Sequence, residues 1–472
     1  MIRRASLCAA LGTALLLPAC QTFSPDGGMD AVAGVAGRAL DKDVAALHTG
    51  EETEAARARV RALLRRPLSA DAAVQVALLN NRGLQAAYNE LGIAEAAFVE
   101  ASLPPNPSLS LQRISGAAEI EIERRIVADI LALATLPARA EIAADRFRQA
   151  QLRAAEETLR IAADTRRSWY RAVAARELDG FLTQAKTAAE TASELARRLG
   201  ETGAMNKLDQ AREHVFYAEI TAQLATARQR GASERERLVR LMGLWGAELG
   251  FKLPSALPPL PRRAQALPAI EVEALRRRVD LQIARLELAA IAKTYGLTQA
   301  TRFINLLEVS GVSRTTIDRQ TGVRIRDRGF DLELQIPIFD FGEVRVREAE
   351  QTYMLAVNRL SERAVNVRSE ARDAYRSYRS SYDIAMHYQR EVLPLRKIIS
   401  DETLLRYNAM MIDVFALLTE ARQRIAATAA AIDAQRDVWL ASVDLATAVT
   451  GGGVASTGRE TTTMGAPSSG SH

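Results

Sequence analysis

One short stretch constrains this chain more than any other. Residues 330–339 read FDLELQIPIF, with Leu332, Leu334, Ile336 and Ile338 on alternate positions and acidic or amide side chains between most of them. Successive side chains of a β-strand point to opposite faces of the sheet. The stretch therefore predicts a strand that is apolar on one face and acidic on the other.

The same alternation occurs at three other places, around residues 107–113, 119–127 and 303–310, which we expect to form two hairpins with 330–339. Ile120 and Ile122, for example, alternate with glutamates. An apolar face opposite a polar face is typical of a barrel wall between lipid and a wet lumen. We therefore expect the lipid-facing side chains to include Ile120, Ile122, Leu332, Leu334, Ile336 and Ile338. Pro337 lacks a backbone donor and belongs at a strand end or edge. The alternative is an amphipathic sheet that caps a helical bundle in water.

The whole chain is rich in Ala, Leu and Arg and has only 5% aromatic residues, which favours long packed helices for most of its length. The formal charge of +5 is spread over 62 basic and 57 acidic residues, so no region predicts nucleic-acid binding. We expect a mainly α protein with a small β part.

The chain repeats one plan at a period near 200 residues. ALLNNRGLQAAYNELGIAEAA at 77–97 aligns with ALRRRVDLQIARLELAAIAKT at 274–294. Each half predicts a moderate helix (70–102, 270–299), a strand pair, a very long helix (138–199, 343–406), a tight turn and a last helix (204–243, 411–448). A heptad run in the first long helix predicts close antiparallel packing; its members are Leu178, Leu182, Ala185, Ala189, Ala192, Ala196 and Leu199.

The N-terminus resembles a bacterial lipoprotein signal. Arg3 and Arg4 precede an apolar stretch that ends in LPAC, which predicts cleavage before Cys20 and lipidation of that residue. The alternative is an ordinary signal peptide that happens to contain Cys20. The organisation we expect is a signal peptide (1–19), a lipidated arm (20–66), a first repeat (67–250), a Pro-rich connector (251–269), a second repeat (270–450) and a disordered tail (451–472).

Four strands are too few to close a transmembrane barrel, because bacterial barrels start at about eight strands. Unpaired strand edges in lipid cost several kcal/mol per backbone group. Several copies must therefore share one barrel: two copies give eight strands and three give twelve.

The duplicated plan resembles the TolC-like outer-membrane factors, the exit ducts of efflux and type I secretion systems. The resemblance covers about residues 67–450 and includes NPSLSL at 106–111 and LQIPIFDFGEVR at 334–345. It implies a homotrimer with a shared twelve-stranded transmembrane barrel, and an α-barrel tunnel of long antiparallel helical hairpins extending into the periplasm. It also implies a periplasmic adaptor protein as partner, an inner-membrane pump reached through the adaptor, and outer-membrane lipid around the barrel.

The resemblance also assigns roles to the turns of the helical hairpins. Carboxylates there would constrict the tunnel, which points to Asp413 and, as a weaker candidate, Asp209. The alternative is that these carboxylates have no role in the tunnel and are simply solvated at the starts of helices. The adaptor would dock at Gly203, Ala204, Met205, Asn408, Ala409 and Met410. The second turn lacks a counterpart of Gly203, and we expect Asn408 to take its left-handed conformation.

No constellation of residues predicts catalysis, a cofactor or a metal site. The four histidines, His48, His214, His387 and His472, are scattered, and no nucleophile elbow or phosphate loop is present in the sequence. Met205, Met410 and Met411 leave copper export as an alternative, since soft sulfur suits Cu(I), although methionine commonly fills apolar gaps. The rival to the channel is a lipid-anchored periplasmic coiled-coil scaffold.

Overall fold

The computed structural model describes residues 23–452. The expected signal peptide (1–19), the expected lipidation site Cys20 and nearly all of the expected tail (451–472) lie outside these residues. Within 23–452, no helix combines the length and the apolarity needed to cross a bilayer.

The chain divides into two compact units that cut across the two repeats. Unit 1 comprises the residues up to 35, 85–155 and 279–366, and unit 2 comprises 36–84, 156–278 and the residues from 367 onward. The order of a hairpin, a long helix, a turn and a last helix occurs twice along the chain. The expected class, mainly α with a small β part, is confirmed.

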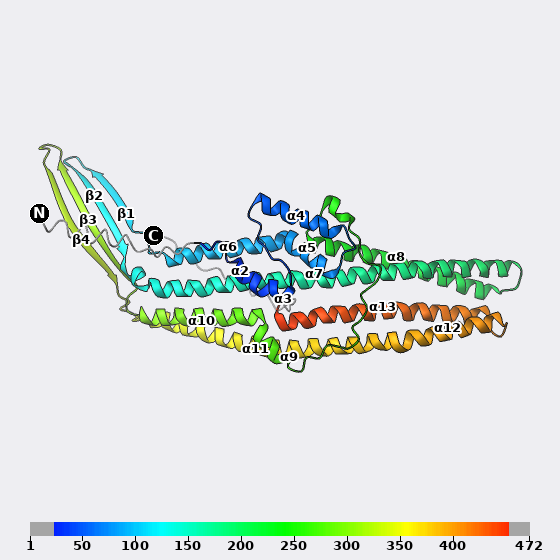
Figure 1. Ribbon diagram of the computed structural model, residues 1–472. Coiled ribbons are helices and arrows are strands. Elements are labelled where there is room, and N and C mark those ends of the chain that lie inside the picture. Colours follow the sequence, from blue (N-terminus) through cyan, green and yellow to red (C-terminus); the bar gives the residue numbers. More distant parts are fainter. Residues whose placement is uncertain (1–22, 453–472) are drawn as a thin grey trace. The chain divides into compact units, whose positions relative to one another are not determined.

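Unit 1 contains one antiparallel sheet with the strand order β1-β2-β3-β4 (Figure 1). Its strands are β1 (Ser108–Ser115), β2 (Glu119–Asp129), β3 (Leu306–Asp318) and β4 (Arg324–Gln335). The two hairpins come from the two repeats, and β2 pairs with β3 from Glu119↔Asp318 to Asp129↔Glu308. The edges of the sheet are therefore β1 and β4.

The expected second hairpin is wrong in its extent. The sequence predicts strands at 303–310 and 330–339, but β3 continues to Asp318 and β4 begins at Arg324. The arginines that interrupt the apolar alternation in 314–328 concealed the outer halves of both strands. Ile336 and Ile338, expected in the strand, lie beyond its end at Gln335.

The segment after β4 explains the FDFG motif. Phe341 and Gly342 both have positive φ, of 48° and 71°. A Cβ on Gly342 would lie 2.2 Å from the carbonyl oxygen of Arg302, so both the conformation and the space require glycine. The next residue begins α11 (Glu343–His387).

The helices of unit 1 are most of α6 (Arg82–Ser102), the first part of α7 (Ile130–Glu201), α10 (Val279–Ala300) and the first part of α11. The N-terminal segment, with α2 (Met29–Val32) and the π-helical η1 (Ala33–Gly37), reaches α6 through Ser24, whose backbone N–H donates to Glu95 at 2.6 Å. The expected start of the long helix at 138 is wrong. α7 begins at Ile130, directly after β2, and the carboxylate of Asp129 accepts from the backbone N–H of Ala132 at 2.8 Å.

The helices of unit 2 surround a large apolar core. They are α3 (Arg38–Leu40), α4 (Gly50–Leu64), α5 (Ala70–Asn80), the rest of α7, α8 (Lys207–Met242), the 3-10 helix η2 (Gly246–Gly250), α9 (Ile270–Arg277), the end of α11, the π-helix η3 (Tyr388–Val392), α12 (Leu393–Asn408) and α13 (Val414–Thr450). Trp169, Leu238, Met242 and Val443 belong to this core. Residues 251–269 carry neither helix nor strand.

Two expected helices are broken. The prediction of one helix at 70–102 is wrong because Asn81 leaves the helical conformation with ψ of 116°. Its side chain accepts from the backbone N–H of Leu84 at 3.0 Å and donates to the carbonyl of Leu241 at 2.8 Å, so it caps α6 and ties it to the end of α8. Arg278, with ψ of 123°, likewise separates α9 from α10 within the expected 270–299.

The expected helix at 343–406 is also not uniform. The π-helical η3 separates α11 from α12 directly before Pro394, which occupies the first turn of α12. Proline cannot donate the next helical hydrogen bond and its ring crowds the preceding turn, and a wider π turn relieves that crowding.

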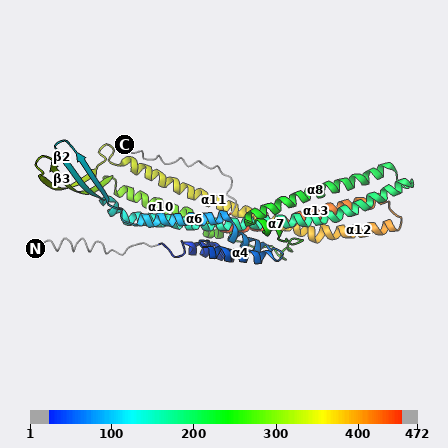
Figure 2. The ribbon, with the colours of Figure 1, turned by 90° about the horizontal axis from the view of Figure 1, so that it is seen from above.

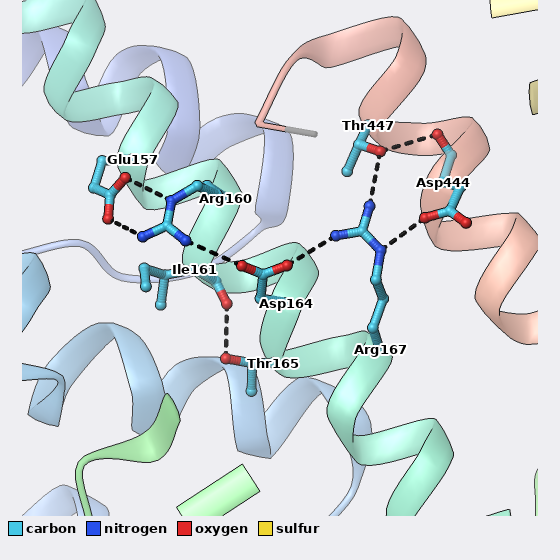
Figure 3. Close-up of polar contacts among 8 residues, drawn as sticks. All are labelled: Glu157, Arg160, Ile161, Asp164, Thr165, Arg167, Asp444 and Thr447. Atoms are coloured by element: carbon cyan, nitrogen blue, oxygen red, sulfur yellow. Dashed lines mark hydrogen bonds and ion pairs between the residues drawn. The ribbon is translucent and has the colours of Figure 1, made fainter. Parts of the chain in front are cut away.

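A polar network joins α7 to α13 inside unit 2 (Figure 3). The guanidinium of Arg167 donates to Asp444 at 2.7 Å, to Asp164 at 3.0 Å and to Thr447 at 3.2 Å, and its side chain is only 8% exposed. Asp164 is shared with Arg160 at 3.1 Å. Each of the three guanidinium nitrogens of this buried cation thus donates to an acceptor, which helps an ion pair to be tolerated away from water.

Candidate channel wall and helical tips

The register of the sheet sorts its side chains into two faces. Directly paired residues of antiparallel strands point to the same side, and the pairs Leu109↔Ile126, Ile126↔Gly311 and Gly311↔Phe330 run across all four strands. We call the side that carries these residues face A and the opposite side face B. Most apolar side chains of face A are exposed in the described chain, namely Leu109, Leu111, Ile126, Val309, Phe330, Leu332 and Leu334.

Face B holds every carboxylate of the four strands. The acidic residues are Glu119, Glu121, Glu123, Asp129, Glu308, Asp318, Asp327, Asp331 and Glu333. They are partly neutralised on the same face, because Arg314 lies 2.6 Å from Glu121 and 3.0 Å from Glu123, and Arg125 lies 3.3 Å from Glu123. Face B is therefore the acidic face of the sheet, and it also carries the exposed apolar side chains of Ile114 and Ile325.

The structure brings Ile120, Ile122, Leu332 and Leu334 onto face A, as the alternation predicts. Ile336 and Ile338 follow β4 in the connection to α11, where both are exposed (52% and 61%). They extend the apolar surface below the base of the sheet but are not strand residues.

The first helical tip joins α7 to α8, which form an antiparallel hairpin (Figure 2). Within it, Ala185 and Ala189 pack against Phe216 and Ile220, so the expected heptad stripe faces α8. Gly203 has φ of 73°, and the backbone N–H of Ala204 donates to the carbonyl of Leu199 at 2.8 Å. This is the pattern of a Schellman-type helix end.

The second tip joins α12 to α13 and ends its helix in the same way. The backbone N–H of Met411 donates to the carbonyl of Arg406 at 2.9 Å, and Met410 has φ of 60°. The expectation that Asn408 adopts the left-handed conformation is wrong: α12 includes Asn408, and Met410 is the left-handed residue. Counted from the N-cap of the next helix, Met410 is the counterpart of Gly203.

The N-cap positions show that the two acidic candidates are not at equivalent positions. Asp413 caps α13 by accepting from the backbone N–H of Ala416 at 2.9 Å, and the matching cap of α8 is Asn206. Asp209 lies three residues into α8, where its two oxygens meet Arg212 at 3.0 Å and Asn206 at 2.7 Å. Asp413 is exposed, and its cap engages only one of its oxygens among the bonds of the described chain.

The methionines of the second tip do not fill gaps within the chain. Met410 is 94% exposed and Met411 is 73% exposed. Leu405 and Leu208 are also largely exposed, at 64% and 60%. The tips of unit 2 therefore present apolar side chains to their surroundings.

Sequence reasoning missed a buried carboxylate in each hairpin. Glu213 and Glu420 both lie seven residues after the N-cap of their helix, and their residues are 2% and 7% exposed. The signal was the shared spacing N/D-x₆-E, which is visible only after the N-caps are aligned. Glu420 lies 3.2 Å from Arg396 of α12, whereas Glu213 lies 3.8 Å from Arg422 of α13.

Arg422 links the two hairpins. Besides Glu213, it donates to the carbonyl of Arg212 at 2.9 Å and lies over the ring of Phe216 at 4.5 Å from its centroid. Burial raises the pKa of Glu213 above its usual value, and the nearby charge of Arg422 opposes that effect. Within residues 23–452, no group of three or more His, Cys, Asp or Glu side chains is placed to hold a metal ion.

Residues 271–400 match the family model described as outer membrane efflux protein. The resemblance to the TolC-like efflux family is therefore confirmed, and the family is one of channels and not of enzymes. No curated protein sequence matches the chain.

Solved structures of outer-membrane channels share the fold. CusC, in a structure on folding and transmembrane channel formation, is 17% identical with a TM-score of 0.68 over 80% of this chain and 91% of that one. The Campylobacter jejuni CmeC channel is 16% identical with a TM-score of 0.70, over 81% and 86%. The Neisseria gonorrhoeae MtrE channel in its open state is 16% identical with a TM-score of 0.65, over 80% and 88%. The comparisons support an outer-membrane efflux channel.

Proposed function

We propose that this protein is the outer-membrane exit duct of a tripartite efflux or type I secretion system, and that it conducts substrates passively. The observation that carries the proposal is the segregation of the sheet, in which apolar side chains line face A and every strand carboxylate lies on face B. Such a wall has a side for hydrocarbon and a side for water.

The open edges of the sheet point to a shared barrel. In the described chain β1 and β4 each pair on one side only, and unpaired backbone groups are not tolerated in lipid. A ring in which β4 of one copy pairs with β1 of the next satisfies both edges. Three copies give twelve strands and a lumen wide enough for water, whereas eight-stranded barrels are filled by side chains. The homotrimer follows.

The rest of the chain fits a periplasmic extension. Lipidation of Cys20 would anchor each copy to the outer membrane, and the helical hairpins would form the tunnel. The exposed Met410, Met411, Leu405 and Leu208 would dock a periplasmic adaptor, together with the turn residues Gly203, Ala204, Met205, Asn408 and Ala409. The adaptor would connect the duct to an inner-membrane pump that supplies the energy.

Asp413 is the better candidate for a ring of carboxylates at the aperture. It is exposed and its capping bond occupies one oxygen, whereas both oxygens of Asp209 are engaged by Arg212 and Asn206. Three copies of Asp413 around one mouth would attract cations.

The decisive experiment compares the channel with a lipid-anchored periplasmic scaffold. The full chain is expressed, extracted from outer membranes, and examined by native mass spectrometry and in planar bilayers. We expect extraction only with detergent, a trimer, and ion conductance. If the acyl-free protein were a stable monomer in detergent-free buffer and conducted no ions, the result would contradict the proposal.

Two neighbouring residues of β4 provide a matched test of the two faces. Leu332→Arg places a charge on face A, which costs about 2–4 kcal/mol at mid-membrane, so we expect no assembled trimer. Glu333→Arg places the same side chain on face B, where we expect normal assembly and weaker cation selectivity. Equal assembly of both variants in outer membranes would show that face A does not meet lipid.

A further inference from the structure

The arginines of the sheet are also segregated. Face A carries the arginines Arg113, Arg124, Arg324, Arg326 and Arg328, all exposed. Face B carries Arg125 and Arg314, and both meet carboxylates. Among the strand residues no carboxylate shares face A with its arginines, so that face has an uncompensated positive charge.

The arginines of face A occupy one zone. The rows that cross the sheet near the hairpin turns include Arg113–Ile122–Thr315–Arg326 and Leu111–Arg124–Ser313–Arg328. The next row toward the base is Leu109–Ile126–Gly311–Phe330, and the rows below it are apolar. We call the cationic zone near the turns the arginine belt.

The guanidiniums of the belt are free within the described chain: none of the five has a hydrogen bond or ion pair there. Arg124 and Arg328 share a row with Ser313 between them, so their strands are about 10 Å apart, and Arg326 lies about 7 Å farther along β4 than Arg328. Side chains of this length can converge on one phosphate, for which the planar guanidinium is well suited.

The belt lies opposite an aromatic boundary. Phe303, Phe339 and Phe341 are exposed at the base of the sheet, at 58%, 98% and 57%. Aromatic girdles mark membrane interfaces of outer-membrane barrels. If the base meets one interface, the apolar rows cross the hydrocarbon and the belt reaches the other interface, on the side away from the helices.

We infer that the arginine belt binds the phosphates of the glycolipid in the outer leaflet, lipopolysaccharide. The inference rests on the proposed function, because it needs face A in lipid and the helices in the periplasm. In a closed ring β4 of one copy lies beside β1 of the next, so the belt continues around the barrel. A neighbouring copy cannot neutralise it through face A, because the strands of that face carry no acid.

The experiment uses the full-length trimer in detergent with purified lipopolysaccharide as the probe. The triple variant Arg124→Gln, Arg326→Gln, Arg328→Gln removes the centre of the belt. The control Arg125→Gln, Arg314→Gln, Arg319→Gln removes the same number of positive charges from face B and the β3–β4 turn. The readouts are the dissociation temperature of the trimer against lipid concentration, and bound glycolipid by native mass spectrometry.

We expect lipopolysaccharide to raise the dissociation temperature of the wild type and of the control, and the belt variant to bind at least about tenfold more weakly. Dephosphorylated glycolipid is expected to have little effect. An unchanged response in the belt variant, or an equal response to dephosphorylated lipid or to phosphatidylglycerol, would overturn the inference.

The two proposals fail in different ways. A wild-type protein that neither forms a trimer nor conducts ions would contradict both the channel proposal and the lipopolysaccharide-binding proposal. A conducting trimer that does not bind lipopolysaccharide would contradict the lipopolysaccharide-binding proposal alone. Planar-bilayer conductance is therefore recorded from the same preparations.

Discussion

The hairpins α7–α8 and α12–α13 bury a glutamate at the same position but partner it differently. Glu420 is held inside its own hairpin, by Arg396 at 3.2 Å. Glu213 depends on the other hairpin, through Arg422 at 3.8 Å. One oxygen of each glutamate and the Nε of Arg422 have no partner among the described groups. The second hairpin is thus self-contained, whereas the tip of the first is completed by the second.

The largest effect is expected from Arg422→Ala. It leaves Glu213 buried without its cation and removes the bond to the carbonyl of Arg212, which we expect to cost about 2–3 kcal/mol of unfolding free energy. The measurement is chemical denaturation, with limited proteolysis of the tips. Arg396→Ala is the matched control, because it should loosen α12 but leave α8 protected from cleavage. Equal cleavage of α8 in both variants would contradict the claim that the first tip depends on the second hairpin.

A smaller effect is expected from Glu213→Gln, and it depends on pH. The folded-state pKa of Glu213 is raised above the usual value of 4.5, so the folded state holds its proton more tightly. Its stabilising contribution is complete below pH 4.5 and is lost as the pH rises through the folded-state pKa. The free energy of unfolding then falls by at most about 1.4 kcal/mol per pH unit.

Denaturation curves measured from pH 4 upward should therefore show stability decreasing in the wild type and a flatter profile in Glu213→Gln. Parallel profiles for the two proteins would mean that Glu213 does not titrate in this window.

The turns of the two tips are expected to differ in conformational free energy by about 1 kcal/mol, and the turn of the first tip is the more favourable one. Met410 holds a left-handed conformation that costs an L-residue about 1–2 kcal/mol, whereas Gly203 adopts it freely. We expect Met410→Gly to stabilise the protein by up to about 1 kcal/mol and Gly203→Ala to destabilise it by a similar amount. Thermal midpoints of the two variants check this, and a lower midpoint for Met410→Gly would show that the methionine side chain makes a stabilising contact.

The smallest effect is expected in the exposed ion cluster of the first hairpin. Bonds from Arg197 and Arg198 lower the pKa of Glu194 to about 2. Because the pKa is lowered in the folded state, Glu194 contributes its full stabilisation above pH 4.5, and that stabilisation is lost as the pH falls toward 2. The group is fully exposed, so water and salt screen its interactions. Glu194→Gln should leave the thermal midpoint at pH 7 nearly unchanged, and a shift of several degrees would reveal a contact between copies.

The sequence could predict the elements whose periodicity is strong. The alternation of β2 and of residues 330–335 identified the sheet and its faces, and the heptad stripe identified the packing of α7 on α8. It could not predict the outer halves of β3 and β4, where arginines on face A interrupt the apolar pattern. Those arginines are compatible with a strand because their side chains are exposed.

Long-range contacts explain the other differences. Nothing local to Asn81 shows that the carbonyl of Leu241 will hold its side chain, so the break between α5 and α6 was invisible. The expectation that Asn408 replaces Gly203 implied an alignment of Ala204 with Ala409, whereas the N-caps Asn206 and Asp413 align Gly203 with Met410. That shift of register hid Glu213 and Glu420 as equivalent positions.

The two joints between strand and helix have mechanical consequences. β2 ends at Asp129 and α7 begins at Ile130, so the strand passes into the helix without a linker. β4 and α11 are separated by residues 336–342, which include Pro337 and two left-handed residues, Phe341 and Gly342. A torque on α7 is transmitted directly to β2, whereas the second joint can absorb rotation of α11. Rotation of α7 about its own axis would therefore carry β2 with it, whereas β4 could keep its orientation while α11 rotates.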